Sequence, residues 1–192
     1  MNSSELKDFA LAGGTGLALQ IGHRISYDLD LFNQKSYNEE KLLQSLSNSF
    51  KLEVINKEAN SLNLFLEGIK VDLLSYRYPL LESIQIIDGI RIFSIKDIAA
   101  MKISAISSRG SKKDFYDIYF ILKIYSLEKI IEFYLNKFSM EQYYHVLKSL
   151  IYFDDAELEP NPELLAKAPS WPDIKVFFEE IVTNFIKMKQ NK

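Results

Sequence analysis

The chain has 192 residues, of which 47% are apolar and 26% charged, a composition typical of soluble globular proteins. Its net charge of −3 argues against a protein that binds nucleic acid over its whole surface, although a local basic patch stays open. The absence of cysteine excludes disulfides and zinc–thiolate sites and fits a reducing cytoplasm. The sequence begins without a signal-peptide pattern, and no apolar run approaches the roughly 20 residues that span a bilayer. We therefore expect a cytoplasmic protein with no membrane part.

The first half of the chain mixes helix and strand patterns. Helical spacing of apolar residues predicts short helices at 6–11, 15–21 and 38–47. Strand-like runs lie at 27–32, 52–55, 62–66 and 69–74. Tight hairpin turns are predicted at Glu67-Gly68 and, more strongly, at Asp88-Gly89, because Asp-Gly suits the positive dihedrals of a type I′ turn.

The second half reads as helices. Four serines precede an Asp or Gln by three residues, which is the spacing of a capping box, and they predict helix starts near Ile95, Lys112, Met140 and Trp171. Another helix is predicted at 127–138, and an acidic, proline-containing loop at 153–169. We expect an α+β (mixed α/β) fold. Residues 1–110 form a core with a small mixed β-sheet flanked by helices, and residues 111–192 form a C-terminal helical region packed on it.

The most informative motif is a glycine pair followed by two aspartates. Gly13-Gly14-Thr15 opens a helix pattern, where glycines allow close approach of phosphate oxygens and the helix start offers free N–H groups. Asp28 and Asp30 follow in the strand pattern, on one face and about 6.6 Å apart along the chain, so they can share a pair of cations. The alternative for the two aspartates is a turn or a solvated edge strand.

Asp72 is a third carboxylate in the middle of a strand pattern. Val71 and Leu73 lie on one face of this strand, and Lys70 and Asp72 on the other. If the strand pairs beside that of Asp28, Asp72 is a third acidic ligand or the base that activates an attacking hydroxyl. The alternative is the solvated outer face of an antiparallel strand.

Lys102 falls in the middle of an apolar stripe. The helix predicted from Ile95 places Ile98, Ala99 and Ile106 on this stripe, whereas its solvated positions are expected to include Asp97. A lysine on the inward face either extends along apolar surface to water or reaches into a polar pocket, where phosphate would stabilise its charge.

The next helix carries two aspartates on its apolar side. Asp114 follows Ser111 at capping-box spacing and favours the helix dipole, but Asp117 lies too far into the helix for that role. Three basic residues, Arg109, Lys112 and Lys113, lie at the start of this helix. They either bind nucleotide phosphates or an RNA backbone, or pair with the two aspartates. Arg24 is a candidate for triphosphate contact, whereas His23 is expected to be a packed or capping residue.

Together these motifs resemble the AbiEii/AbiGii-type nucleotidyltransferases of the DNA polymerase beta superfamily. Gly13-Gly14-Thr15 with Asp28 and Asp30 is similar to the first family motif, 70–72 to the second, 94–102 to the third and 109–117 to the fourth. The resemblance covers nearly the whole chain. One departure is Thr15, where the superfamily often has serine; the hydroxyl is kept.

The resemblance implies NTP as substrate, Mg²⁺ as cofactor with two ions, and transfer of a nucleoside monophosphate to an RNA acceptor such as tRNA. It also implies a toxin of a type IV toxin–antitoxin or abortive-infection system, with an antitoxin as protein partner.

On this basis the site residues are expected to fall into three groups. Metal ligands are Asp28, Asp30 and Asp72. These three, with Lys102 and Asp117, are the catalytic residues. Nucleotide-binding residues are Gly13, Gly14, Thr15, Arg24, Lys113 and Asp114.

Two rival functions stay open on sequence alone. The same pocket could transfer a γ-phosphoryl group, as a kinase does, or the chain could be a non-catalytic nucleotide-binding subunit. Label that reaches the acceptor from the α-phosphate would indicate nucleotidyl transfer, and label from the γ-phosphate would indicate the kinase-like reaction. An absence of Mg²⁺-dependent NTP binding would indicate the non-catalytic subunit.

Overall fold

The computed structural model describes residues 4–191, which divide into two compact units. Unit 1 combines the chain up to Gln20 with Ser26–Ser94, and unit 2 combines Ile21–Ile25 with the chain from Ile95 onward. Residues 95–110, which we placed with the first region, thus lie in the second unit. The reason is packing, because the helix α3 (Ile95–Arg109) lies against the three helices α4 (Lys112–Ile121), α5 (Leu127–Phe138) and α6 (Tyr144–Ser149).

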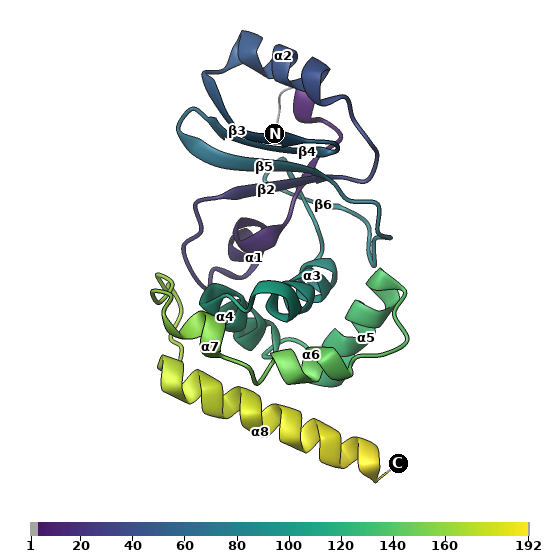
Figure 1. Ribbon diagram of the computed structural model, residues 1–192, viewed down its shortest axis with the longest axis vertical. Helices are drawn as coiled ribbons and strands as arrows, with labels where there is room; N and C mark the ends of the chain where they lie inside the picture. Colours follow the sequence, from purple (N-terminus) through teal and green to yellow (C-terminus); the bar gives the residue numbers. More distant parts are fainter. Residues whose placement is uncertain (1–3, 192) are drawn as a thin grey trace. The chain divides into compact units, whose positions relative to one another are not determined.

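Unit 1 is built on one mixed sheet. Within the described residues its seven strands follow the order β3-β4-β5-β2-β1-β7-β6 (Figure 1). β2 runs parallel to β5 and antiparallel to β1, and β1 is parallel to β7. The strand bounds are β1 (Ala10–Leu11), β2 (Leu29–Asn33), β3 (Leu52–Glu58), β4 (Ser61–Leu66), β5 (Ile69–Ser75), β6 (Gln85–Ile87) and β7 (Ile90–Ile92).

The two faces of this sheet differ in what covers them. α1 (Gly13–Ile21) and α2 (Glu39–Ser49) lie on opposite sides of it (Figure 1). On the α2 side, Leu42 and Leu46 belong to a buried apolar cluster with Leu31 and Leu73. The alternation of side chains along a strand therefore puts Asp30 and Asp72, neighbours of these leucines, on the other face.

Most of the elements predicted in this half are confirmed. Both hairpin turns have the two successive positive φ angles of a type I′ turn, at Glu67 (51°) and Gly68 (80°) and at Asp88 (50°) and Gly89 (78°). The helix predicted at 6–11 is wrong. A short 3₁₀ turn, Ser4–Leu6, is followed by the strand β1, because backbone pairing with β2 and β7 overrides a six-residue apolar pattern that fits either structure.

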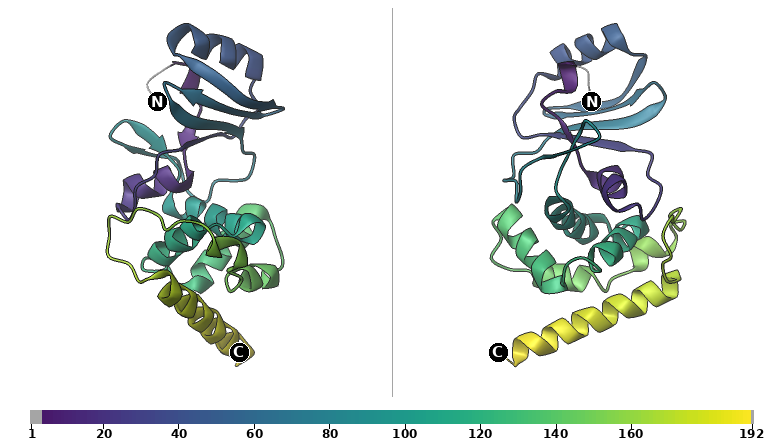
Figure 2. Two further views of the ribbon diagram at one scale, coloured as in Figure 1. Left: turned by 60° about the vertical axis from the view of Figure 1, so that its left-hand side comes forward. Right: turned by 180° about the vertical axis from the view of Figure 1, so that it is seen from behind.

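Unit 2 is helical and has an aromatic core. Besides α3 to α6 it contains α7 (Asp154–Glu157) and α8 (Trp171–Gln190), and α8 lies against α4 and α5 (Figure 2). Phe115 is in edge contact with Trp171 and Phe178, at ring-centroid distances of 5.7 and 5.4 Å. The segment 21–25 joins this unit through backbone bonds such as Ile25 N–H to Glu163 O at 2.9 Å.

The helix starts at Ile95, Lys112 and Trp171 and the helix at 127–138 are confirmed. The start near Met140 is wrong: Ser139 ends α5 in a left-handed conformation (φ 52°), so it serves as a C-cap rather than an N-cap, and α6 begins only at Tyr144. At α4 the cap comes from another segment, since the Glu159 carboxylate accepts from the Lys112 N–H at 2.8 Å.

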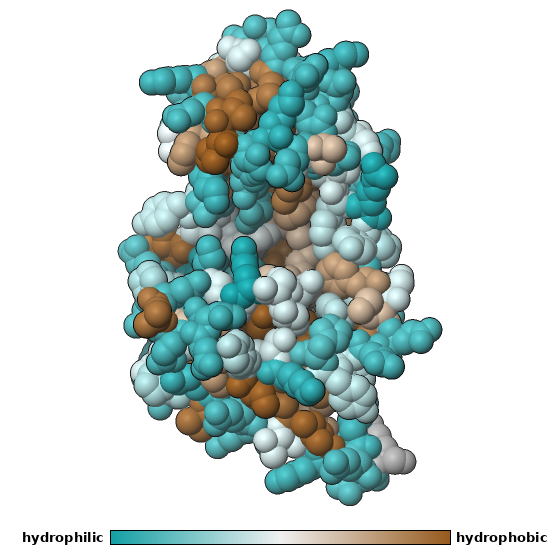
Figure 3. Space-filling view, viewed as in Figure 1, coloured by the Kyte–Doolittle hydropathy of each residue, from teal (hydrophilic) through white to brown (hydrophobic). Residues whose placement is uncertain are grey.

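Apolar side chains that remain on the surface are spread over several elements. Figure 3 shows hydrophobic residues along α8, where Val176 and Met188 are about half exposed. No helix within residues 4–191 combines the length and the apolar character that crossing a membrane requires.

Candidate active site

The glycine motif forms the start of α1 in unit 1. Gly13 has φ +59°, a left-handed conformation that glycine adopts without strain. The first bond of the helix runs from the Gly16 N–H to Ala12 O at 2.8 Å. The N–H groups of Gly13, Gly14 and Thr15 therefore stand at the helix start without an intrahelical acceptor, which is the arrangement that binds anions.

Asp30 lies directly against this helix start. A Cβ atom on Gly13 would lie 1.9 Å from Asp30 Oδ2 and 2.7 Å from Asp30 Cγ. In addition, the Ala12 N–H donates to Asp30 O at 2.9 Å. Only glycine at position 13 leaves room for the carboxylate, so the glycine motif and the aspartate motif are one structural feature.

Asp30 and Asp72 are brought together by strand register. β2 and β5 pair in parallel with Asp30 opposite Asp72, so the two side chains lie on the same face of neighbouring strands about 4.8 Å apart. On sequence grounds, a role for Asp72 depends on its strand pairing beside that of Asp28. This pairing is present. Asp28 itself precedes β2 by one residue and is half-buried.

Thr15 ties Asp28 to α1. Its hydroxyl donates to Asp28 O and lies 2.9 Å from Ser26 Oγ. Because the hydroxyl proton is used in this way, the group that Thr15 presents at the helix start is its backbone N–H. The hydroxyl that Thr15 retains in place of serine holds the aspartate segment in position.

Asp72 has two partners on its own sheet. Asn63, its register partner on β4, donates from Nδ2 to Asp72 Oδ1 at 2.8 Å, and Lys70 Nζ lies 3.9 Å from Asp72 Oδ2. Asp72 keeps some exposure to solvent. The amide therefore orients the carboxylate on the face that also carries Asp30.

The predicted metal ligands fit Mg²⁺ in chemistry and in register. Asp28, Asp30 and Asp72 supply only carboxylate oxygens, the donors that this ion prefers. Among residues 4–191, no three His, Cys, Asp or Glu side chains come together closely enough to hold one ion in the conformation described. The fit therefore rests on the donor types and on the Asp30–Asp72 pairing.

The remaining predicted residues lie in unit 2, and Arg24, Asp114 and Asp117 gather with Lys102 in one cluster. Lys102 is 4% exposed, and its amine bonds Asp114 Oδ1 at 2.6 Å and Asp117 Oδ2 at 2.5 Å. Burial would lower the pKa of Lys102, but Asp117 and Asp114 outweigh it and raise the pKa above its usual value. Lys102 is thus a charged amine in a polar cluster, not a lysine that extends to water.

Asp117 is the centre of this cluster and is fully buried. It accepts from His23 Nε2 at 2.7 Å and from Arg24 Nε at 2.6 Å and Nη2 at 3.0 Å, in addition to Lys102. Burial alone would raise the pKa of Asp117, but the Lys102 charge and the bonds from His23 and Arg24 lower it well below the usual range.

Three further residues of the prediction have clear positions. Arg24 is buried against Asp117, so contact of Arg24 with a triphosphate stays a prediction. Asp114 also receives Arg109 Nη2 at 3.0 Å, from a side chain that is 58% exposed. Lys113 is exposed.

The solvated position expected for Asp97 on α3 is wrong. Asp97, expected at a solvated position, is fully buried and accepts from the buried Lys137 at 2.7 Å. The pairing partner lies 40 residues away in the sequence, so the helical pattern of α3 alone did not indicate it.

Comparison with known protein families shows to which family the chain belongs. The family described as nucleotidyl transferase AbiEii toxin, type IV TA system, matches residues 1–181. The chain belongs to the AbiEii family. It is accordingly a nucleotidyltransferase, and membership of a type IV toxin–antitoxin family implies an NTP substrate and an antitoxin partner.

Individual proteins resemble the AbiEii chain in sequence or in fold. An uncharacterized protein of Aquifex aeolicus (strain VF5) is 34% identical over 189 residues, which cover 94% of this chain and 89% of that protein. The crystal structure of JHP933 from Helicobacter pylori is similar with a TM-score of 0.56 and 19% identity, over 97% of this chain and 89% of that one.

MenT4, the nucleotidyltransferase toxin Rv2826c of Mycobacterium tuberculosis H37Rv, is similar with a TM-score of 0.55 and 14% identity, over 91% of this chain and 74% of that one. At these low identities the solved structures show that the AbiEii chain shares their fold. The nucleotidyltransferase core expected from the sequence is thereby confirmed.

Two residues of the AbiEii site escaped the sequence prediction. Asn63 lies between Leu62 and Leu64, and this alternation, with the predicted pairing of its strand, would have placed it on the face of Asp72. His23 was expected to be a packing residue, and it is buried, but its bond to Asp117 joins elements 94 residues apart and leaves no local signal.

Proposed function

We propose that this AbiEii chain transfers a nucleoside monophosphate from an NTP to an RNA acceptor such as tRNA, in a Mg²⁺-dependent reaction, as the toxin of a type IV toxin–antitoxin or abortive-infection pair in the cytoplasm. The observation that carries the proposal is the pairing of Asp30 with Asp72 on one sheet face, with Asp30 against the glycine at the start of α1. N–H groups suited to phosphate, at the start of α1, therefore lie next to carboxylates suited to a metal ion within unit 1.

The start of α1 binds the triphosphate in this proposal. The free N–H groups of Gly13, Gly14 and Thr15 donate to phosphate oxygens, and the helix dipole adds partial positive charge at the same point. The left-handed φ of Gly13 supports this role, since it directs the backbone around the Asp30 carboxylate.

The acidic face would hold the metal. Asp28, Asp30 and Asp72 are the residues that would bind two Mg²⁺ ions, which supply charge neutralisation at the acceptor hydroxyl and at the leaving pyrophosphate. Asp72 is the carboxylate proposed to accept the proton of the acceptor hydroxyl. The bond from Asn63 fixes its Oδ1, so Oδ2, which lies 3.9 Å from Lys70 Nζ, is the oxygen that would take the proton.

Lys102 is proposed to neutralise charge that develops on the transferred phosphoryl group. An ammonium has three N–H donors, and two of them bind Asp114 and Asp117, so one remains for a phosphate oxygen. Asp114 and Asp117 orient Lys102, and Arg24 and Lys113 are further candidates for contact with the nucleotide.

The acceptor is the part of the proposal that rests on the family resemblance. The test is incubation of the protein with total RNA, Mg²⁺ and each of the four NTPs, labelled in turn at the α- and at the γ-phosphate. We expect α-label, and no γ-label, on an RNA the size of tRNA. Transfer of γ-label would indicate a phosphotransferase instead, and label on protein alone would refute the RNA acceptor.

A further inference from the structure

The sheet face that carries Asp72 continues onto β4. Asn63 and Phe65 lie on this face. They alternate along β4 with Leu62 and Leu64, which are buried in the apolar cluster on the α2 side. The bond from Asn63 Nδ2 to Asp72 Oδ1 at 2.8 Å shows directly that the two strands share this face. Phe65 is therefore on the same side of the sheet as the acidic residues.

The order of the strands indicates from which side the acceptor reaches Asp72. The start of α1, proposed to bind the triphosphate, lies against Asp30 on β2, and the order β2-β5-β4 puts β4 on the far side of Asp72. In nucleotidyl transfer the acceptor oxygen forms a bond to the α-phosphorus, the bond from that phosphorus to pyrophosphate breaks, and the hydroxyl proton passes to Asp72. The attacking and leaving oxygens lie roughly in line. With the pyrophosphate held at α1, the acceptor therefore approaches over β4.

Phe65 and Lys70 are the neighbours of Asp72 on this path. Phe65 is the register partner of Lys70 in the antiparallel pair of β4 and β5, so it lies diagonally from Asp72, at about 7–8 Å. Lys70 precedes Asp72 by two residues on the same strand face, and its Nζ lies 3.9 Å from Asp72 Oδ2. A nucleotide whose hydroxyl is at Asp72 can reach both side chains, because a single ribose joins that hydroxyl to the base and to the phosphate.

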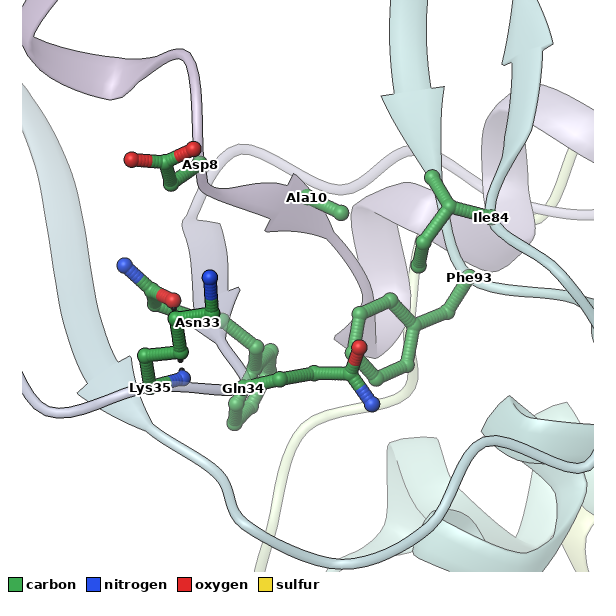
Figure 4. A pocket seen from close by; sticks show the side chains of 8 residues that line it. Asp8, Ala10, Asn33, Gln34, Lys35, Ile84 and Phe93 are labelled. Atoms are coloured by element: carbon green, nitrogen blue, oxygen red, sulfur yellow. Dashed lines mark hydrogen bonds between the residues drawn. The ribbon is translucent and has the colours of Figure 1, made fainter.

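The Phe65 ring is available for stacking. It is 39% exposed, and within residues 4–191 it is paired with no other aromatic ring and no cation. The pocket in Figure 4 differs in this respect, since Phe32 and Phe93, which line it, are nearly fully buried and in contact with each other. An exposed aromatic ring beside a basic side chain is the kind of surface that binds single-stranded nucleic acid, in which the face of a base is free.

Lys70 supplies a positive charge for the adjoining phosphate. Its side chain is 43% exposed, and its contact with Asp72 is a loose surface ion pair, which contributes little to stability. The ammonium therefore has donors left for a phosphate oxygen. On the other side of Phe65 the register partner is Glu53 of β3, an exposed carboxylate that repels phosphate. The charges thus favour a nucleotide whose phosphate lies over β5 and whose base lies over β4.

We propose that Phe65 and Lys70 form the binding site for the reacting nucleotide of the acceptor, with its base stacked on Phe65 and its phosphate on Lys70. The inference rests on the proposed function, and it adds these two residues to the site. Stacking on an aromatic ring accepts every base, since each base has a flat face. A base inside a duplex has both faces covered, so the acceptor is an RNA whose reacting nucleotide lies in a single strand.

Fluorescence titration tests the site without catalysis. The probe is a short single-stranded RNA with 2-aminopurine as the terminal base, at the end with the free 3′-hydroxyl, because the fluorescence of this analogue falls when it stacks. Wild type should quench the probe. Phe65→Ala should bind it about tenfold more weakly and without quenching, whereas Phe65→Tyr should keep both properties. The matched control is Ile69→Ala, which should behave as wild type, since Ile69 is 47% exposed and lies on the opposite face of β5.

The salt dependence of binding separates the roles of the two residues. Lys70→Met should reduce the slope of the logarithm of the association constant against the logarithm of salt concentration by about 0.7, the value for one phosphate contact in a single strand. Phe65→Ala should leave this slope unchanged. The proposal would be overturned if Phe65→Ala quenches the probe as wild type does, if the analogue is quenched equally at an internal position, or if Lys70→Met keeps the wild-type slope. Failure of wild type to bind the probe would overturn it as well.

Transfer assays separate this inference from the proposed function. With α-labelled NTP, Phe65→Ala should lower kcat/KM for RNA about tenfold and leave the KM for NTP unchanged. If Phe65→Ala transfers label as fast as wild type at limiting RNA, the nucleotide site is refuted and the proposed function stands. If wild type transfers no label to RNA, the proposed function is refuted, and the fluorescence titration alone decides whether Phe65 binds a base.

Discussion

Replacing Gly13 by alanine tests whether the glycine motif exists to admit the Asp30 carboxylate. The new Cβ would lie 1.9 Å from Asp30 Oδ2, so the carboxylate must move. The chain offers a matched control in Gly22, which has nearly the same φ (+61° against +59°) but no heavy atom within 4 Å of the position that a new Cβ would take. Alanine costs about 1–2 kcal/mol in this left-handed conformation at either site, which corresponds to a fall in Tm of about 2–8 °C for a chain of this size.

The two variants should separate in activity. Gly22→Ala should lose stability only, whereas Gly13→Ala should also lose at least about 100-fold in NMP transfer, because a displacement near 1 Å in a reacting group costs about that much. Thermal melts and α-label transfer at a temperature where both variants are folded provide the measurement. If Gly13→Ala transfers label as fast as Gly22→Ala does, the carboxylate is not required where the structure places it.

The other predictions concern side-chain partners. Lys102→Met leaves buried aspartates without their amine and should cost about 3–5 kcal/mol in urea unfolding, whereas Arg109→Met, at an exposed ion pair, should cost no more than about 1 kcal/mol; equal losses would contradict the buried cluster. The folded pKa of Asp117 lies below its unfolded value of about 3.9, so its stabilisation is complete above that pH and is lost as pH falls through the folded pKa. The unfolding free energy should therefore fall below about pH 4, and less steeply in Lys102→Met; identical slopes would refute the coupling. Asn63→Ala should lower kcat by about 10- to 100-fold with little change in Tm, since it removes the donor that orients Asp72; an unchanged kcat would show that the bond is dispensable.

Local patterns were sufficient for much of the fold. The strands β2 to β5 alternate strongly enough, and the Asp88-Gly89 turn is specific enough, that their positions follow from the sequence. The face of Asp72 also followed from alternation. Its pairing with Asp30 did not, because parallel register is set by the packing of the whole sheet.

The errors arose where a distant partner decides the structure. The helix predicted at 6–11 is a strand because β2 and β7 pair with it, and Asp97 is buried because Lys137 reaches it from another helix. Ser139 has the spacing of an N-cap but the conformation of a C-cap, since α5 ends there. In each case a short window fits two structures, and contacts far along the chain select one of them.

The central claim is that Asp30 belongs to a metal-dependent transfer site, and Asp30→Asn tests it most directly. The variant keeps the shape of the side chain beside Gly13 and removes its charge. Transfer of α-label to RNA should be present in wild type with Mg²⁺, absent after chelation, and absent in Asp30→Asn, while the thermal melt stays nearly the same. Full transfer by a folded Asp30→Asn variant, or transfer that persists without a divalent ion, would contradict the account.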